Sequence, residues 1–185
     1  MSKKKKQNPP KNEAKMVEAE QSELGMSHWL WLSGFVIALD YVTKLITIKT
    51  MTLHERIEIL PFFNFTRAHN TGAAFSFLAN AGGWQRWMFA AISIGVSIAL
   101  VIWLLKTPKN DRWMACCLAL IVGGALGNLY DRLVYGYVVD FLDFHGSIFG
   151  LILGYNHFPA FNVADIAISV GAFMMAVDVI RNPHK

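Results

Sequence analysis

Apolar residues form four long runs along the chain, separated by shorter polar segments. The runs cover about 29–48, 84–105, 113–135 and 161–180. Each approaches the roughly 20 residues that an α-helix needs to cross the hydrocarbon core of a bilayer. The second run, which contains MFAAISIGVSIALVIWLL, is the clearest of them. The pattern predicts an all-α membrane protein with four transmembrane helices in a single domain, residues 27–185.

The segment before the first run differs from the rest of the chain. Residues 1–26 are polar, contain Pro9 and Pro10 and show no apolar period, which predicts a disordered basic tail. A basic start followed by an apolar run also describes a cleavable signal peptide. However, Asp40 and Lys44 interrupt the far end of the run, and no small-residue cleavage motif follows it. We therefore interpret the first run as an uncleaved membrane helix.

The connection between the first two runs, residues 49–83, is long for a simple turn. Within it, large apolar residues recur at even spacings, the period of a β-strand, at Ile57, Ile59, Phe63 and Phe65. A strand beside lipid must have partners for its backbone groups. The sequence therefore predicts a small amphipathic β-sheet that lies on the outer face of the membrane crossed by the helices. In the later connection, 136–160, the pattern does not decide between helix and strand.

Composition and charge add the orientation of the helices. The chain is 54% hydrophobic and 16% charged, with a net charge of +4, which is far from a usual soluble domain. The positive charges gather in the tail, in the loop 106–112 and at the end, 181–185. Cytoplasmic segments of membrane proteins collect lysine and arginine, so we expect both termini in the cytoplasm and the other two connections in the periplasm. Topology accounts for the charge, and we expect no nucleic-acid partner.

Cysteine and histidine give no indication of a metal centre. Cys116 and Cys117 are neighbours inside an apolar run, where they are expected to be small core residues. The six histidines show no spacing typical of metal ligands. We expect the outer-loop histidines to be solvated, namely His54, His69, His145 and His157. The sequence therefore predicts no metal site.

Ionisable residues within the runs lie close to the predicted outer face. Asp40 and Lys44 stand four residues apart on the first helix, which is the spacing of a local ion pair. Asn128, Asp131 and Arg132 share one face of the third helix, and we predict an interfacial salt bridge between Asp131 and Arg132. A charge at membrane depth is costly unless it is paired or faces water, so these helix faces should point into the bundle.

Two further carboxylates stand at the outer boundary. Asp140 follows the third helix in VVDF, and Asp165 begins the fourth in FNVAD. If the helices bring them together, both cannot ionise cheaply, and the pair supplies an acid and a base for peptide hydrolysis. Asp165 could instead be a charge favoured by the helix dipole. Asp143, three residues after Asp140, is the main rival for a place in this pair. Geometry does not settle the choice, and we discount Asp143 only because the polar, loop-like HGS follows it.

Two other functions are compatible with the same residues. Intramembrane acids also mark proton relays, so the alternative is a small proton-coupled carrier or assembly subunit. A relay would distribute ionisable groups through the depth of the bundle, whereas the centres of the second and fourth runs contain none. A purely structural scaffold would explain Asp131 and Arg132 but leaves Asp140 and Asp165 without a role.

Four sequence blocks in this order resemble one known family. They are LDYVTK at 39–44, NTGAAFSFL at 70–78, GGALGNLYDRLVYGYVVDF at 123–141 and FNVAD at 161–165. Together they resemble lipoprotein signal peptidase, the bacterial signal peptidase II. The resemblance extends over residues 28–181 and leaves out the lysine-rich tail.

The resemblance implies a cofactor-independent aspartyl protease of the bacterial inner membrane. Such an enzyme removes signal peptides from prolipoproteins whose lipobox cysteine carries diacylglycerol, and the antibiotic globomycin inhibits it. The catalytic pair would be Asp140 and Asp165. The residues expected to bind substrate and inhibitor are Asp40, Asn70, Gly72, Asn128, Arg132 and Asn162. The outer sheet would act as a flexible lid over them.

Overall fold

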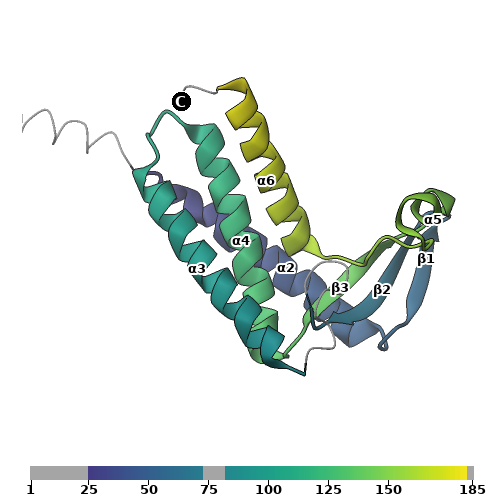
Figure 1. Ribbon diagram of the computed structural model, residues 1–185. Helices are drawn as coiled ribbons and strands as arrows, with labels where there is room; N and C mark the ends of the chain where they lie inside the picture. Colours follow the sequence, from purple (N-terminus) through teal and green to yellow (C-terminus); the bar gives the residue numbers. More distant parts are fainter. Residues whose placement is uncertain (1–24, 73–81, 183–185) are drawn as a thin grey trace, which may run out of the picture.

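The computed structural model describes residues 25–72 and 82–182. Within these residues, four long helices lie side by side as a bundle (Figure 1). They are α2 Leu30–Thr50, α3 Trp84–Lys106, α4 Arg112–Val134 and α6 Val163–Arg181. A short 3₁₀ turn, η1 Ser27–Trp29, precedes α2. All four helices are long and apolar enough to cross a membrane, so the four predicted spans are confirmed.

The end of the predicted tail belongs to the bundle. Most of residues 1–26 lie outside the described residues, but Met26 is buried against Leu104, Met114 and Leu118. The backbone N–H of Met26 donates to the carbonyl of Leu104 at the end of α3. An apolar side chain next to the first span is buried more favourably than solvated, so Met26 belongs to the bundle.

Helix α4 is the central helix of the bundle and packs against α2, α3 and α6. Its glycines permit this close packing, as predicted for small residues in membrane helices. A Cβ atom at Gly123 would lie 2.8 Å from the Cβ of Val36 on α2, and one at Gly124 would overlap the backbone of Ala164 on α6. The close contact between α4 and α6 therefore depends on the absence of side chains at these positions.

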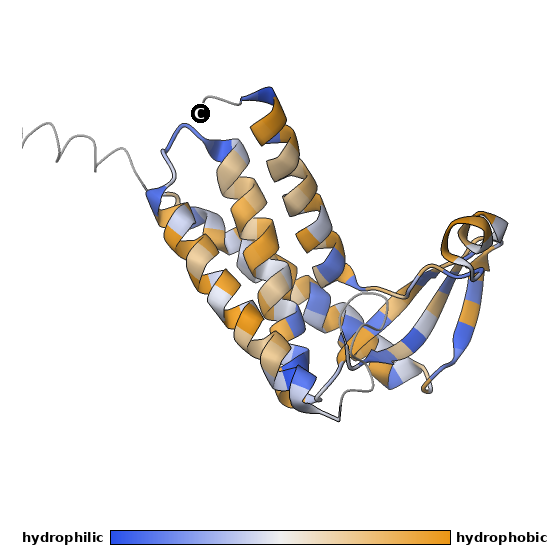
Figure 2. Cartoon of the chain, in the orientation of Figure 1, coloured by the Kyte–Doolittle hydropathy of each residue, from blue (hydrophilic) through white to orange (hydrophobic). Residues whose placement is uncertain are grey.

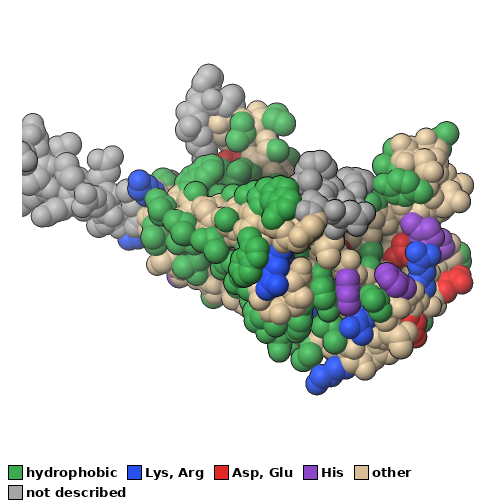
Figure 3. Space-filling model, turned by 60° about the horizontal axis from the view of Figure 1, so that its bottom comes forward, with side chains coloured by type: hydrophobic (Ala, Val, Ile, Leu, Met, Phe, Trp, Pro, Cys, Tyr) green, Lys and Arg blue, Asp and Glu red, His purple; other side chains and the backbone are tan. Residues whose placement is uncertain are grey.

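The flanks of the bundle are apolar and exposed. Large hydrophobic side chains such as Ile98, Trp103 and Phe173 are open to the surroundings, and Figure 2 shows hydrophobic residues along all four helices. Charged and histidine side chains gather instead over the outer sheet (Figure 3). A continuous apolar surface of this extent is suited to lipid rather than to water.

The outer sheet has three antiparallel strands in the order β1-β2-β3. They are β1 Arg56–Leu60, β2 Phe63–Asn70 and β3 Val138–Phe144. The predicted sheet is confirmed, and the segment left open between helix and strand supplies its third strand. Paired positions alternate between an apolar row, Ile57, Phe65 and Leu142, and a polar row, Glu58, Asn64 and Asp143. The sheet is therefore amphipathic.

After β3, the chain turns through the short helix α5 Ser147–Leu153 and returns to the bundle. On its way back, Phe161 forms backbone hydrogen bonds with Leu142 in both directions, at 2.9 and 3.1 Å. Helix α6 then begins at Val163, later than the predicted 161, because Asn162 caps it. The return segment thus fixes the start of α6 beside β3.

Candidate active site

Asp140 on β3 and Asp165 on α6 are joined through one residue. The Nδ2 of Asn162 donates to Oδ1 of Asp140 at 2.8 Å, and its backbone N–H donates to Oδ2 of Asp165 at 3.2 Å. Asn162 reaches both because the pairing of Phe161 with Leu142 brings the start of α6 next to β3. It is completely buried. The structure therefore brings the two predicted carboxylates to one site.

The remaining oxygen of each carboxylate has its own amide donor. Asn70 Nδ2 donates to Oδ2 of Asp140 at 3.1 Å, and Asn128 Nδ2 donates to Oδ1 of Asp165 at 2.8 Å. Amide donors hold a carboxylate in place without adding a positive charge. The two carboxylates therefore have fixed positions and no direct cationic partner in these contacts.

Beneath these amides lies the buried ammonium group of Lys44. Its Nζ is 2.7 Å from Asp40, 2.9 Å from Asp131 and 3.0 Å from Oδ1 of Asn128. The same Asn128 oxygen accepts from Asn162 at 3.2 Å. Two donors on that oxygen dictate that the NH₂ end of Asn128 faces Asp165. Lys44 thereby sets the orientation of the amide that holds a catalytic candidate.

The predicted ion pairs are confirmed in one case and wrong in the other. Asp40 pairs with Lys44, as its spacing indicates. Asp131 does not pair with Arg132; it contacts Lys44 and accepts from the backbone N–H of Val139 at 3.0 Å. Neighbouring residues on a helix point in different directions, so Asp131 faces α2 while Arg132 points elsewhere.

Arg132 lines the same site as the two carboxylates. Its guanidinium donates to the carbonyls of Gly72 at 3.2 Å and Asn128 at 3.3 Å, and it lies over the ring of Phe89. Hydrogen bonds to carbonyls leave it without a carboxylate in direct contact. Arginine has five donors, so this side chain can bind further backbone carbonyls.

A cavity of about 670 Å³ opens onto the carboxylates. Asp140, Asp165, Asn70, Asn128 and Arg132 line it, together with an apolar wall from α6 and residues 158–161. Of the other residues expected to bind substrate, Asp40 and Asn162 are buried and do not line the cavity. The carbonyl of Gly72 accepts a hydrogen bond from Arg132, which does line it. Asp40 accepts from the backbone N–H of Ala164 at 2.9 Å and so supports the start of α6.

The environment of Asp140 favours its protonated form. Burial in low dielectric, and next the negative charge of Asp165, raise the pKa of Asp140 to about 8, against the lowering effect of the hydrogen bonds from Asn70 and Asn162. At neutral pH this carboxyl group therefore holds a proton. A carboxylic acid beside a second carboxyl group is the arrangement that supplies an acid and a base from one residue type.

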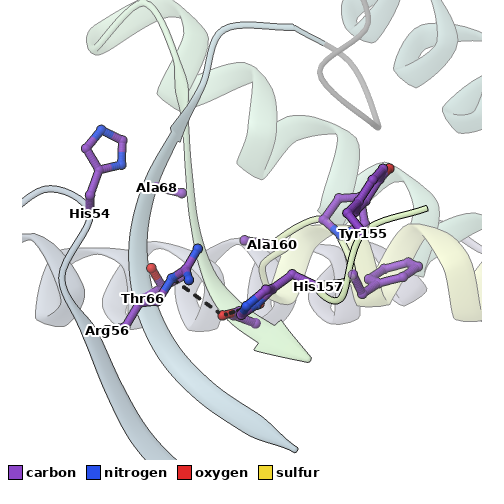
Figure 4. A pocket seen from close by; sticks show the side chains of 10 residues that line it. His54, Arg56, Thr66, Ala68, Tyr155, His157 and Ala160 are labelled. Atoms are coloured by element: carbon purple, nitrogen blue, oxygen red, sulfur yellow. Dashed lines mark hydrogen bonds and ion pairs between the residues drawn. The ribbon is translucent and has the colours of Figure 1, made fainter. Parts of the chain in front are cut away.

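Asp143, the rival carboxylate, has partners of its own. Its oxygens accept from Asn64 Nδ2 at 3.0 Å, lie 2.9 Å from Nδ1 of His157 and face Arg56 at 3.8 Å. Asp143, His157 and Arg56 line a second cavity of about 470 Å³ on the outer sheet (Figure 4). His157 is thus paired with a carboxylate and not simply solvated, which corrects the expectation for it. Asp143 does not line the cavity of Asp140 and Asp165.

The sequence did not indicate how many site residues Lys44 contacts. It appeared only as the local partner of Asp40, whereas the structure places its charge under two carboxylates and one site amide. A signal was present, since a lysine inside a membrane span requires several partners. Two of those partners, Asp131 and Asn128, come from α4, and sequence spacing on α2 alone does not identify them.

The comparisons with known proteins agree with this geometry. Residues 32–181 match the family described as signal peptidase (SPase) II. The chain is 50% identical over 157 residues to the lipoprotein signal peptidase of Alteromonas mediterranea, covering 85% of this chain and 82% of that protein. It is 49% identical over 159 residues to the lipoprotein signal peptidase of Pseudomonas aeruginosa, covering 85% and 90%.

A solved structure supports the fold as well. A bacterial membrane enzyme solved by the in meso method superposes with a TM-score of 0.74 at 32% sequence identity, covering 88% of this chain and 94% of that one. The family match, residues 32–181, includes the outer sheet, α3, α4, α6 and all but the first two residues of α2. By both sequence and fold, the chain belongs to the signal peptidase II family of membrane peptidases.

Proposed function

We propose that the protein is an aspartyl endopeptidase that removes the signal peptide from diacylglyceryl-modified prolipoproteins, cleaving before the lipidated lipobox cysteine. The observation that carries the proposal is the bridging of Asp140 and Asp165 by Asn162 on one wall of a cavity. Family membership supports peptidase activity, and the relatives are named for lipoprotein substrates.

The two carboxyl groups divide the chemistry of hydrolysis. Asp165 takes a proton from a water molecule, whose oxygen forms a bond with the scissile carbonyl carbon. Asp140, which keeps its proton at neutral pH, donates a hydrogen bond to the carbonyl oxygen. The carbon–nitrogen bond then breaks and the leaving amine takes up the proton. Proton transfer by positioned carboxyl groups contributes about 10²–10⁴-fold to such rates.

The rest of the cavity suits a substrate held in the membrane. Its wall on α6 includes Ile166, Ile168 and Val170, which can contact the apolar signal segment or the acyl chains. Arg132 and Asn70 can bind the carbonyls of an extended backbone near the scissile bond. Orienting that bond is a large part of any hydrolase's rate gain. A globomycin-type peptide inhibitor would occupy the same cavity.

The proposed location is the bacterial inner membrane, with both termini in the cytoplasm. The support is the gathering of lysine and arginine in the tail, in 106–112 and at the C-terminal end, because such segments stay in the cytoplasm. The site then lies at the periplasmic ends of α4 and α6. Lipid-modified substrates arrive there laterally from the bilayer, and water reaches the same level.

Cleavage of matched peptides tests the proposal. Purified protein in lipid is incubated with two peptides of one lipobox sequence, of which only one carries diacylglycerol on its cysteine, and the products are identified by mass spectrometry. We expect cleavage before the cysteine in the lipidated peptide and little in the other. Equal cleavage of both peptides, or cleavage elsewhere, would contradict the proposed specificity.

Activity should also decline on the alkaline side of neutrality. Since the pKa of Asp140 is raised to about 8, the proton that the mechanism needs is present below this pH and is lost above it. We expect kcat/KM to fall by about tenfold for each further pH unit. The pH profile is measured with the lipidated peptide in neutral lipid, to keep the membrane charge constant. Undiminished cleavage at strongly alkaline pH would show that the pair needs no proton.

A further inference from the structure

The short helix α5 presents an apolar stripe to its surroundings. Ile148, Leu151 and Ile152 stand at i, i+3 and i+4, so they share one face of the helix. Their residues are 55%, 84% and 69% exposed. The ring of Phe149, in contrast, packs against Phe158 on the return segment, with 5.8 Å between the ring centroids. One side of the helix thus packs against the protein, and the other side is exposed.

The sequence around this stripe contains no charge. Residues 146–156 read GSIFGLILGYN, and the loop is closed at its base by the bridge between His145 and His157. Tyr155, beside the helix, is about half exposed, and tyrosine is enriched at membrane interfaces. A loop designed for water would carry polar side chains at such exposed positions. The composition therefore favours an apolar environment.

The position of α5 indicates what that environment is. It lies at the far end of the outer sheet, to the side of the bundle and not beyond the outer ends of α2 and α3 (Figure 1). Its surface is hydrophobic in Figure 2. The open cavity wall on α6 is apolar too, with Ile166 and Val170 exposed in the first half of the helix. The stripe therefore continues the lipid-facing surface of the spans laterally.

We propose that α5 is a membrane anchor that inserts Ile148, Leu151 and Ile152 into the outer leaflet of the bilayer that the four helices cross. Short amphipathic helices bind membranes by burying their apolar face at the headgroup boundary. The return segment after α5 supplies Phe158, Pro159 and Ala160 to the walls of both cavities. The anchor therefore sets the level of this wall relative to the lipid.

Site-specific fluorescence tests the anchor without relying on peptidase activity. An environment-sensitive NBD label is attached at Ile152→Cys, in a background with Cys116→Ala and Cys117→Ala, and the protein is reconstituted into phosphatidylcholine vesicles. A matched label at Glu58→Cys reports an exposed position on β1. We expect blue-shifted emission at position 152 and strong quenching by lipids that carry a nitroxide just below the headgroup. The label at position 58 should show water-like emission and little quenching.

A second variant separates insertion from local packing. Adding Ile148→Ser and Leu151→Ser removes most of the stripe but keeps Phe149 against Phe158, so the label at 152 should move to water-like emission while thermal stability in detergent stays unchanged. Water-like emission at 152 in the parent protein would overturn the proposal. So would a blue shift that depends on protein density, which indicates a second copy, or one that appears only with a lipidated peptide, which indicates substrate.

Discussion

Asp165→Asn and Asp140→Asn are each expected to abolish cleavage of the lipidated peptide. Asparagine can neither take a proton from water nor supply one at neutral pH, so the loss should reach at least about 10³-fold in kcat. The rate constants are measured under single-turnover conditions, with protein in excess over peptide. Substrate binding should persist in both variants because Arg132, Asn70 and the apolar wall remain.

The matched control for these variants is Asp143→Asn. Asp143 is equally buried and lies on the same strand as Asp140, but its partners are Asn64, His157 and Arg56. We expect this variant to lose some stability of the outer sheet and to keep cleavage within a few-fold of the parent. If Asp143→Asn is inactive while Asp165→Asn cleaves normally, the catalytic pair has been assigned to the wrong residues.

Lys44→Met is expected to have the largest effect on stability. Methionine matches the length of lysine but leaves Asp40 and Asp131 buried without a cation, and removing one partner of a buried ion pair costs about 3–5 kcal/mol. The side chain of Lys44 is only 2% exposed, so water does not replace it. The free energy of unfolding is measured by denaturant titration in mixed micelles. Lys49→Met, at an exposed position of the same helix, should leave it unchanged.

A triple variant distinguishes the two roles of Lys44. Asp40→Asn and Asp131→Asn, added to Lys44→Met, remove the uncompensated charges and should restore much of the stability. Asn128 Oδ1 then still lacks the ammonium donor and keeps only the donor from Asn162, so its amide is held less firmly and kcat should stay low. Full recovery of kcat together with stability would show that Lys44 supports the fold alone and does not position Asn128.

The sequence predicted the elements whose apolar residues follow a regular pattern. Apolar runs of bilayer length predicted the four helices, and even spacing in 49–83 predicted the short strands of a small sheet. The third strand was not identified because Val138, Val139 and Phe141 are all buried, so the segment has no alternation that separates it from a helix. Its identity depends on pairing with β2, which is a tertiary contact.

The site was predictable as a set of residues but not as a set of contacts. Asp140 and Asp165 were identified as candidates because a carboxylate at a membrane boundary is costly to bury and commonly has a function. That Asn162 joins them, and that Asp131 turns to Lys44 instead of Arg132, depends on how α4 approaches α2 and α6. Gly123 and Gly124 permit that approach, and spacing along one helix does not specify the direction of its neighbours.

The first turn of α6 has a practical consequence for trapping the enzyme with substrate. Asn162 and Asp165 form a capping box, in which each side chain accepts from the backbone of the other. Shortening Asp165 to alanine would therefore loosen the helix start as well as remove a carboxylate. Asp140 is not a member of this capping box; its Oδ1 accepts from Nδ2 of Asn162, and Asp140→Asn keeps an oxygen that can accept there. An inactive protein for structural work with bound substrate is thus better made at Asp140, where the loss of chemistry leaves the beginning of the helix intact.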